Sequence, residues 1–125
     1  MFTTYYNEKT LSSYGNVYLL QYGSYINKNV MEENIKKLDN YISYEDDGKY
    51  YVFLGMYTNL ENAKKVSKIF EDKNIYTFIK NDYIDNNEII NKITNLEKNI
   101  TEEEDANKID EINNKILDEV ESIVY

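Results

Sequence analysis

The chain contains no cysteine, histidine, arginine, proline or tryptophan. Without cysteine or histidine, a structural zinc site, a disulfide framework and catalysis by a thiol or an imidazole are all excluded. All 14 basic residues are lysines, so bidentate arginine contacts with phosphate or carboxylate are excluded too. General acid or base chemistry would be left to carboxylates, lysine or tyrosine. We therefore expect no metal site, no cofactor and no enzymatic activity.

Long apolar runs are also missing. No stretch approaches the roughly 18–20 apolar residues of a membrane-spanning helix. No basic segment followed by an apolar one marks a signal peptide at the start of the chain. The length of 125 residues suits one domain. The polar and aromatic residues 1–15 are expected to form a flexible lead.

Charge and tyrosine divide the chain in two. Residues 1–83 carry 11 acidic residues and 10 lysines, a net charge of −1, whereas residues 84–125 carry 12 acidic residues and 4 lysines, a net charge of −8. Thirteen of the 14 tyrosines precede residue 84. We expect a domain over 16–83 and an acidic helical extension over 84–125. Neither part has the clustered cations that nucleic acid or an anionic membrane surface would attract.

Residue patterns predict two strand-helix-strand units. β-Branched and aromatic runs predict strands, and apolar residues at helical spacing predict helices. Asp47-Gly48 has the chemistry of a hairpin turn, and Asn59 can cap the second helix, although Asn62 leaves a capping box incomplete. The expected elements are strands 16–25, 41–44, 49–57 and 75–80, with helices at 29–40 and 59–73.

The two units are an internal repeat. Gly23-Ser24-Tyr25-Ile26-Asn27 matches Gly55-Met56-Tyr57-Thr58-Asn59, and 41–44 matches 75–78. One unit alone would leave an uncovered sheet edge and an apolar helix face. Together the two units predict an α+β fold, a four-stranded antiparallel sheet with both helices on one face.

Two segments carry a family resemblance. The run Leu20-Gln21-Tyr22-Gly23-Ser24-Tyr25 resembles the first signature of the SPOR (sporulation-related repeat) family, and Tyr50 to Tyr57, with the following Asn62-Ala63, resembles the second. The resemblance covers about residues 16–81 by order, spacing and repeat. It implies a ferredoxin-like βαββαβ domain, plus the C-terminal helical extension, that binds peptidoglycan glycan strands lacking stem peptides. The implied place is the septal cell wall of division or sporulation.

The resemblance also implies a cellular location, and this chain differs from the family signature at one place. Such domains are usually tethered to an envelope protein or a cell-wall hydrolase, which implies an extracytoplasmic place in the bacterial cell envelope, with a tether outside this chain. Relatives often carry arginine at outward positions of the third strand, where this chain has Tyr51 and Phe53. An alternative function is therefore a protein-interaction or assembly module that has the fold without glycan binding.

Strand alternation assigns a candidate glycan-binding face. Leu20, Tyr22, Val52 and Leu54 are expected in the core. Alternation places Val17, Leu19, Gln21, Tyr51 and Phe53 on the open face, and the symmetry of the repeat adds Ile42, Tyr44, Tyr76 and Phe78. Aromatic rings there could stack on sugars, and Gln21 could donate to and accept from hydroxyl or N-acetyl groups. The alternative is that the acidic extension covers this face. The candidate glycan-binding residues are Val17, Leu19, Gln21, Tyr44, Tyr51, Phe53, Tyr76 and Phe78.

The acidic extension has its own pattern. Isoleucine and leucine spacing predicts amphipathic helices over about 86–99 and 102–124, and Thr101 to Glu104 reads as a capping box for the second. Three alternatives are open for these helices: packing on the domain, packing on each other, or a coiled coil with a second copy or a protein partner. The acidic run Glu102 to Asp105 lacks the spaced ligands of a calcium loop. An enzyme with a carboxylate pair is the weakest hypothesis, because no motif places two carboxylates in a cleft.

Overall fold

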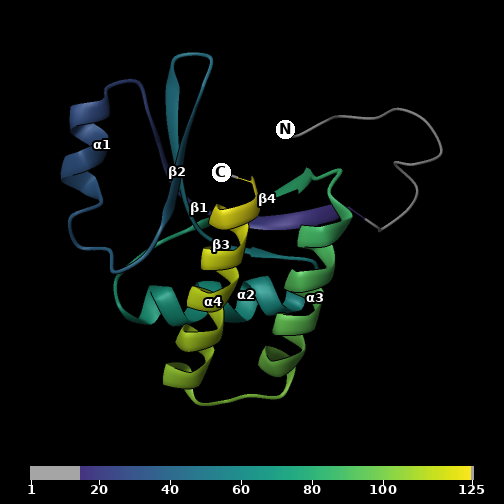
Figure 1. Cartoon of the computed structure of the whole chain (residues 1–125). Coiled ribbons are helices and arrows are strands. Elements are labelled where there is room, and N and C mark those ends of the chain that lie inside the picture. The colour runs from purple at the N-terminus through teal and green to yellow at the C-terminus, as the bar shows by residue number, and fades with distance from the viewer. Residues whose placement is uncertain (1–14, 125) are drawn as a thin grey trace.

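The computed structural model describes residues 15–124, with side chains as far as Ser122. The expected flexible lead, 1–15, lies outside the described residues except for Gly15. Four strands and four helices follow one another in the described part (Figure 1). In chain order they are β1 (Asn16–Tyr25), α1 (Lys28–Asn34), β2 (Ile42–Asp46), β3 (Lys49–Tyr57), α2 (Leu60–Asp72), β4 (Phe78–Tyr83), α3 (Asn87–Thr101) and α4 (Ala106–Val124).

The strands form one antiparallel sheet in the order β2-β3-β1-β4. Each βαβ unit places its two strands apart, with a strand of the other unit between them, which is the arrangement of a ferredoxin-like fold. The helices pack on one face of the sheet, so the predicted fold class is confirmed. Figure 1 shows α3 and α4 side by side over the strands, with α1 at one side of the molecule.

The internal repeat is visible in the backbone. Asn27 and Asn59 end the two Gly-x-Tyr-x-Asn segments, and each is the N-cap of the next helix, with φ/ψ of −112°/123° and −118°/123°. Both asparagine side chains accept the first free backbone N–H groups of their helix. The predicted cap at Asn59 is confirmed, and the same motif produces the same local structure twice.

The hairpin turn between β2 and β3 is also confirmed. Asp47 has φ of 51° and Gly48 has φ of 78°. Positive φ at both central residues is the requirement of a two-residue hairpin turn whose twist matches that of the strands. This turn fixes the register that pairs Tyr44 with Tyr51 and Ile42 with Phe53.

Helix α1 is shorter than the predicted 29–40. It ends at Asn34, and Met31 is its only buried residue. The side chain of Asn34 donates to the carbonyl of Val30, and the Tyr22 hydroxyl donates to the carbonyl of Asn34. With so little apolar surface to bury, the segment after residue 34 continues as turns.

Strand β4 begins three residues later than predicted. Residues 73–75 close the C-terminus of α2: Asn74 takes a φ of 64°, and the backbone N–H of Ile75 donates to the carbonyl of Phe70. Ile75 is therefore tied to the end of the helix and cannot open a strand. As a consequence Tyr76 precedes β4 and does not belong to the sheet.

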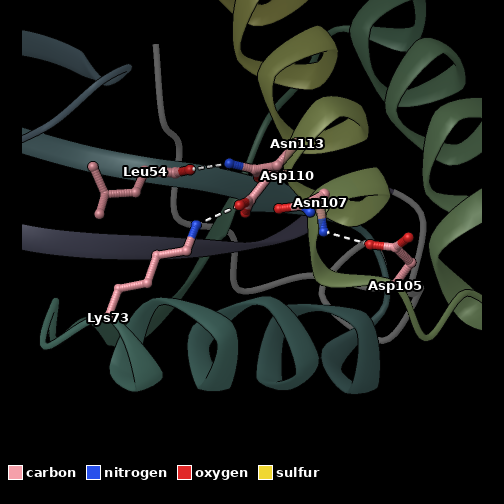
Figure 2. A network of polar contacts seen from close by, with 6 residues as sticks. All are labelled: Leu54, Lys73, Asp105, Asn107, Asp110 and Asn113. Carbon is pink, nitrogen blue, oxygen red and sulfur yellow. Dashed lines mark hydrogen bonds and ion pairs between the residues drawn. The ribbon is translucent and has the colours of Figure 1, made fainter.

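The predicted capping box at residues 101–104 is wrong. Thr101 is the last residue of α3, and α4 begins only at Ala106. The side chain of Asp105 accepts the backbone N–H of Asn107 at 2.9 Å, as an N-cap residue does (Figure 2). The isoleucine at 100 is buried in the core, and its burial extends α3 through the expected cap.

The two extension helices belong to the same core as the sheet. Residues with at most 1% exposure line their inner sides and join the strand residues in one cluster. Of the expected alternatives, packing on the domain and on each other is what the structure shows. No helix within residues 15–124 is long and apolar enough to cross a membrane. The buried residues of this set are Ile89, Ile93, Ile100, Ile109, Ile116 and Val120.

Candidate binding face

One row of side chains crosses all four strands on the predicted open side of the sheet. Gln21 on β1 pairs with Phe53 on β3 and with Phe78 on β4, and Phe53 pairs with Ile42 on β2. Directly paired residues of antiparallel strands point to the same side. We call this side the aromatic face, and it also carries Tyr44 and Tyr51, which pair with each other.

The tyrosines of this face form an ordered cluster. The rings of Tyr44 and Tyr51 stack with centroids 5.2 Å apart and an interplanar angle of 22°. The Tyr44 ring also meets Phe53 edge-on, at 6.0 Å and 67°. Such offset and edge-to-face pairs fix ring positions in advance. The aromatic face therefore presents a pre-arranged pair of half-buried tyrosines beside Gln21.

Lysine 80 is a member of this face that the sequence interpretation missed. It lies on β4, yet its ammonium is 5.7 Å from the ring centroid of Tyr51 on β3. Because β1 separates these two strands, the side chain of Lys80 must extend across β1 on the aromatic face. Strand alternation puts residues 80 and 82 on the same side of the sheet as Phe78, so the sequence pattern could have identified Lys80.

Three of the predicted site residues are not accessible, which corrects the open-face prediction. Val17 is 0% exposed, and Leu19 and Phe53 are each 2% exposed. They were assigned to the open face by alternation, which gives the side of the sheet but not what covers it. Phe53 lies edge-on under the Tyr44 ring, so an apolar side chain on this side of the sheet can belong to the core.

The remaining predicted residues divide into two groups. Gln21, Tyr44 and Tyr51 are half-buried, while Phe78 keeps 67% of its surface exposed. Tyr76 is 64% exposed but lies before β4, so the sheet register does not place it on the aromatic face. The accessible part of the face is therefore Gln21, Tyr44, Tyr51 and Phe78, with Lys80 added.

Charge on this face is mixed. Burial, together with the smaller effects of Asp82, Tyr51 and Asp46, raises the pKa of Tyr44 to about 12. The Tyr44 hydroxyl thus stays protonated and can donate a hydrogen bond throughout the physiological pH range. The face offers stacking surface, a cation and neutral hydrogen-bonding groups together.

The opposite, helix-covered face is closed by a polar contact from α4. Asn113 is 2% exposed, and its amide nitrogen donates to the Leu54 carbonyl at 2.8 Å (Figure 2). Its side-chain oxygen accepts the Tyr57 hydroxyl. The register of β1 and β3 shifts between Leu19 and Gln21, where Leu54 and Gly55 both lie opposite Leu20. This bulge frees the Leu54 carbonyl from the ladder, and Asn113 satisfies it.

A second buried group joins α3 to the start of α2. Glu97 is 3% exposed, and its carboxylate accepts the backbone N–H groups of Thr58 at 2.7 Å and Asn59 at 3.2 Å. It also accepts the Thr58 hydroxyl and, at 2.9 Å, the side-chain amide of Asn62. The negative charge sits at a helix N-terminus, where the backbone dipoles favour it. This is a structural use of the carboxylate, with every contact internal.

Neither a metal site nor a similar known protein indicates a function for the aromatic face. Within residues 15–124, no group of three or more carboxylates is placed to hold a metal ion. Comparison of the chain with family models, with curated proteins and with solved structures finds no match. The geometry of the aromatic face is therefore the main support for a functional assignment.

Proposed function

We propose that this chain is a non-catalytic carbohydrate-binding module whose ligand is the glycan strand of peptidoglycan, in its form without stem peptides. The observation that carries the proposal is the stacked Tyr44–Tyr51 pair on the same sheet face as Gln21 and the exposed ring of Phe78. Pyranose rings present C–H faces that pack on aromatic rings, and their hydroxyl and N-acetyl groups need donors and acceptors. The side-chain amide of Gln21 offers both.

The resemblance of residues 20–25 and 50–57 to the SPOR signatures supports the same ligand. The outward arginine of those relatives is absent, but the Lys80 ammonium lies on the same face, above Tyr51. A cation is therefore present, although it comes from the fourth strand. On this proposal the chain acts at the bacterial cell wall, outside the cytoplasmic membrane, and reaches it through a tether beyond the sequence described.

Retention on peptidoglycan sacculi tests the proposal. The full chain is incubated with sacculi before and after treatment with an amidase that removes stem peptides, and the bound fraction is measured. We expect stronger retention on the treated sacculi. Replacing Tyr51 and Phe78 together by alanine should weaken retention about tenfold or more, since about 1.4 kcal/mol of lost contact corresponds to that factor.

Two controls make this result specific. Ile26 lies between β1 and α1, is 80% exposed and does not belong to the paired strand residues of the aromatic face. Ile26→Ala should therefore leave retention unchanged. Circular dichroism should show all variants folded. Absence of retention of the wild-type chain on both preparations would refute the proposal.

The alternative, an assembly module acting through residues 84–125, is constrained by packing. The apolar sides of α3 and α4 are buried in the chain's own core, so a partner would have to bind their polar, acidic outer sides. Light scattering over a range of concentrations tests it. A molecular mass that does not change with concentration would speak against self-association.

A further inference from the structure

A small polar pocket lies on the helix-covered side of the molecule, away from the aromatic face. Its volume is about 150 Å³. Its walls come from three separate parts of the chain: residues 37–40 before β2, residues 70–75 around the end of α2, and residues 110–114 of α4. A water molecule needs only about 10–15 Å³ on this measure, whereas drug-sized ligands occupy about 300–1,000 Å³. The pocket suits a small molecule.

The charges of the lining are balanced. Lys37 and Lys73 supply two cations, and Asp39 and Asp110 supply two carboxylates. Lys73 and Asp110 form an ion pair between the end of α2 and α4 (Figure 2). A ligand with a single charge would take one member of this pair away from the other and give up the attraction between them. A ligand that carries one charge of each sign satisfies both.

Fixed amide groups add hydrogen-bonding capacity. Asn113 lines the pocket, and its position is set by its contacts with Leu54 and Tyr57. An amide has two N–H donors and two acceptor lone pairs, so one of each remains beyond those contacts. Asn40 donates to Asn114 at 3.3 Å, which joins two of the walls. The pocket is thus partly pre-organised before a ligand arrives.

We infer that this pocket binds a small zwitterion, namely a free amino acid with a short side chain. The carboxylate of the ligand pairs with Lys73, its ammonium pairs with Asp110, and its side chain meets the apolar wall that includes Phe70 and Ile75. The ligand carboxylate replaces Asp110 as the counter-ion of Lys73, and the ligand ammonium replaces Lys73 as the counter-ion of Asp110. The net charge of the pocket therefore does not change.

Calorimetric titration of the full chain with L-alanine tests the inference against two matched probes. Propionate has the same carbon chain as alanine without the ammonium, and ethylamine has the alkyl ammonium without the carboxylate. We expect alanine to bind in the millimolar range, as its few atoms allow. Each half-probe should bind about tenfold more weakly or less. Tryptophan should not bind, because its side chain exceeds the pocket.

Variants locate the binding. Asp110→Asn keeps the size of the side chain and removes the partner of the ligand ammonium, so alanine affinity should fall about tenfold or more. Lys92→Gln breaks the ion pair between Lys92 and Glu119, which also joins two elements but lies outside the pocket, and should have no effect. Tyr51→Ala on the aromatic face should also leave alanine binding intact, which separates this inference from the proposed function.

Three results would overturn the inference. The first is no heat of binding with alanine up to about 100 mM, far above the millimolar range expected. The second is propionate binding as well as alanine, which would indicate a simple anion site. The third is equal alanine binding by wild type and a folded Asp110→Asn variant. If that variant does not fold, the half-probe comparison on the wild-type chain decides alone.

Discussion

The hydroxyl of Tyr57 at the end of β3 donates a hydrogen bond to the side-chain oxygen of Asn113 in α4, across 56 positions of sequence. The same asparagine donates to the carbonyl of Leu54. One buried side chain of the extension therefore serves two groups of the central strand. The relationship links the acidic extension to the repeat domain more tightly than apolar packing alone.

Removing either partner should destabilise the fold. We expect Tyr57→Phe to lower the free energy of unfolding by about 1–3 kcal/mol, because the buried oxygen of Asn113 loses its donor. Asn113→Ala should cost more, since it leaves both the Tyr57 hydroxyl and the Leu54 carbonyl without a partner. Urea denaturation measures both changes. Asn95→Ala, at an exposed position of α3, serves as the control and should change stability by no more than about 0.5 kcal/mol.

The carboxylate of Glu97 should not tolerate an amide. Both of its oxygens accept hydrogen bonds, so the NH₂ group of Glu97→Gln would face donors from residues 58, 59 or 62. We expect a loss of about 1.5–3 kcal/mol in thermal or denaturant unfolding. Glu111→Gln, exposed on α4, is the matched substitution. Equal effects of the two changes would contradict the structural role given to Glu97.

Two glycines should respond to alanine for different reasons. A Cβ at Gly55 would lie 2.9 Å from the Asn113 oxygen, 2.9 Å from the Tyr57 ring and 3.1 Å from Leu20. Gly55→Ala should therefore cost about 1–3 kcal/mol through overpacking. A Cβ at Gly48 meets nothing within 4 Å, but φ is +78°.

The contrast between these glycines is tested with asparagine, which tolerates positive φ better than alanine does. Asparagine should recover stability at position 48 relative to alanine there. At position 55 it should be worse than alanine, because the site lacks space. Recovery at both positions would show that backbone conformation, and not the approach of α4, limits residue 55.

Stability should fall in strongly alkaline solution. Burial, with Asp82, raises the pKa of Tyr44 from 10 to about 12, and burial, with Glu97 and Asp110, raises that of Tyr57 well above its usual value. The unfolded chain then loses these protons before the folded chain does, so the stability present below pH 10 is lost as the pH rises toward 12.

Unfolding by urea at a series of alkaline pH values measures this slope. Tyr44→Phe removes one titrating group and should make the decline shallower. Tyr76→Phe, which changes a tyrosine that is 64% exposed, is the control. A decline of the same steepness in wild type and Tyr44→Phe would contradict the environment described for Tyr44.

The sheet was predictable because its determinants are local. The Asp47-Gly48 turn, the Asn59 cap and the alternation in β1 and β3 each act within a few residues. The errors arose where a tertiary contact decides. Ile75 closes α2 before β4 begins, and the burial of Ile100 carries α3 beyond the residue that would cap the next helix.

The candidate site was predicted in part for the same reason. Alternation correctly placed Gln21 and Phe53 on one side of the sheet, since it depends on the pleat alone, and the symmetry of the repeat correctly added Phe78. It could not show that Phe53 is buried, nor that Lys80 reaches across β1 to Tyr51, because those facts depend on side chains from other strands. Asn113 gave no signal, since its role exists only once the bulge in β3 has formed.

The contact of α4 with β3 also has a consequence for synthesis on the ribosome. Leu54 and Tyr57 receive this partner only from Asn113 of α4, more than 50 positions later in the sequence. A nascent chain that has released only the repeat still lacks one wall of its core. We therefore expect the central strand to gain full protection from hydrogen exchange only after α4 has left the ribosome and can pack against it.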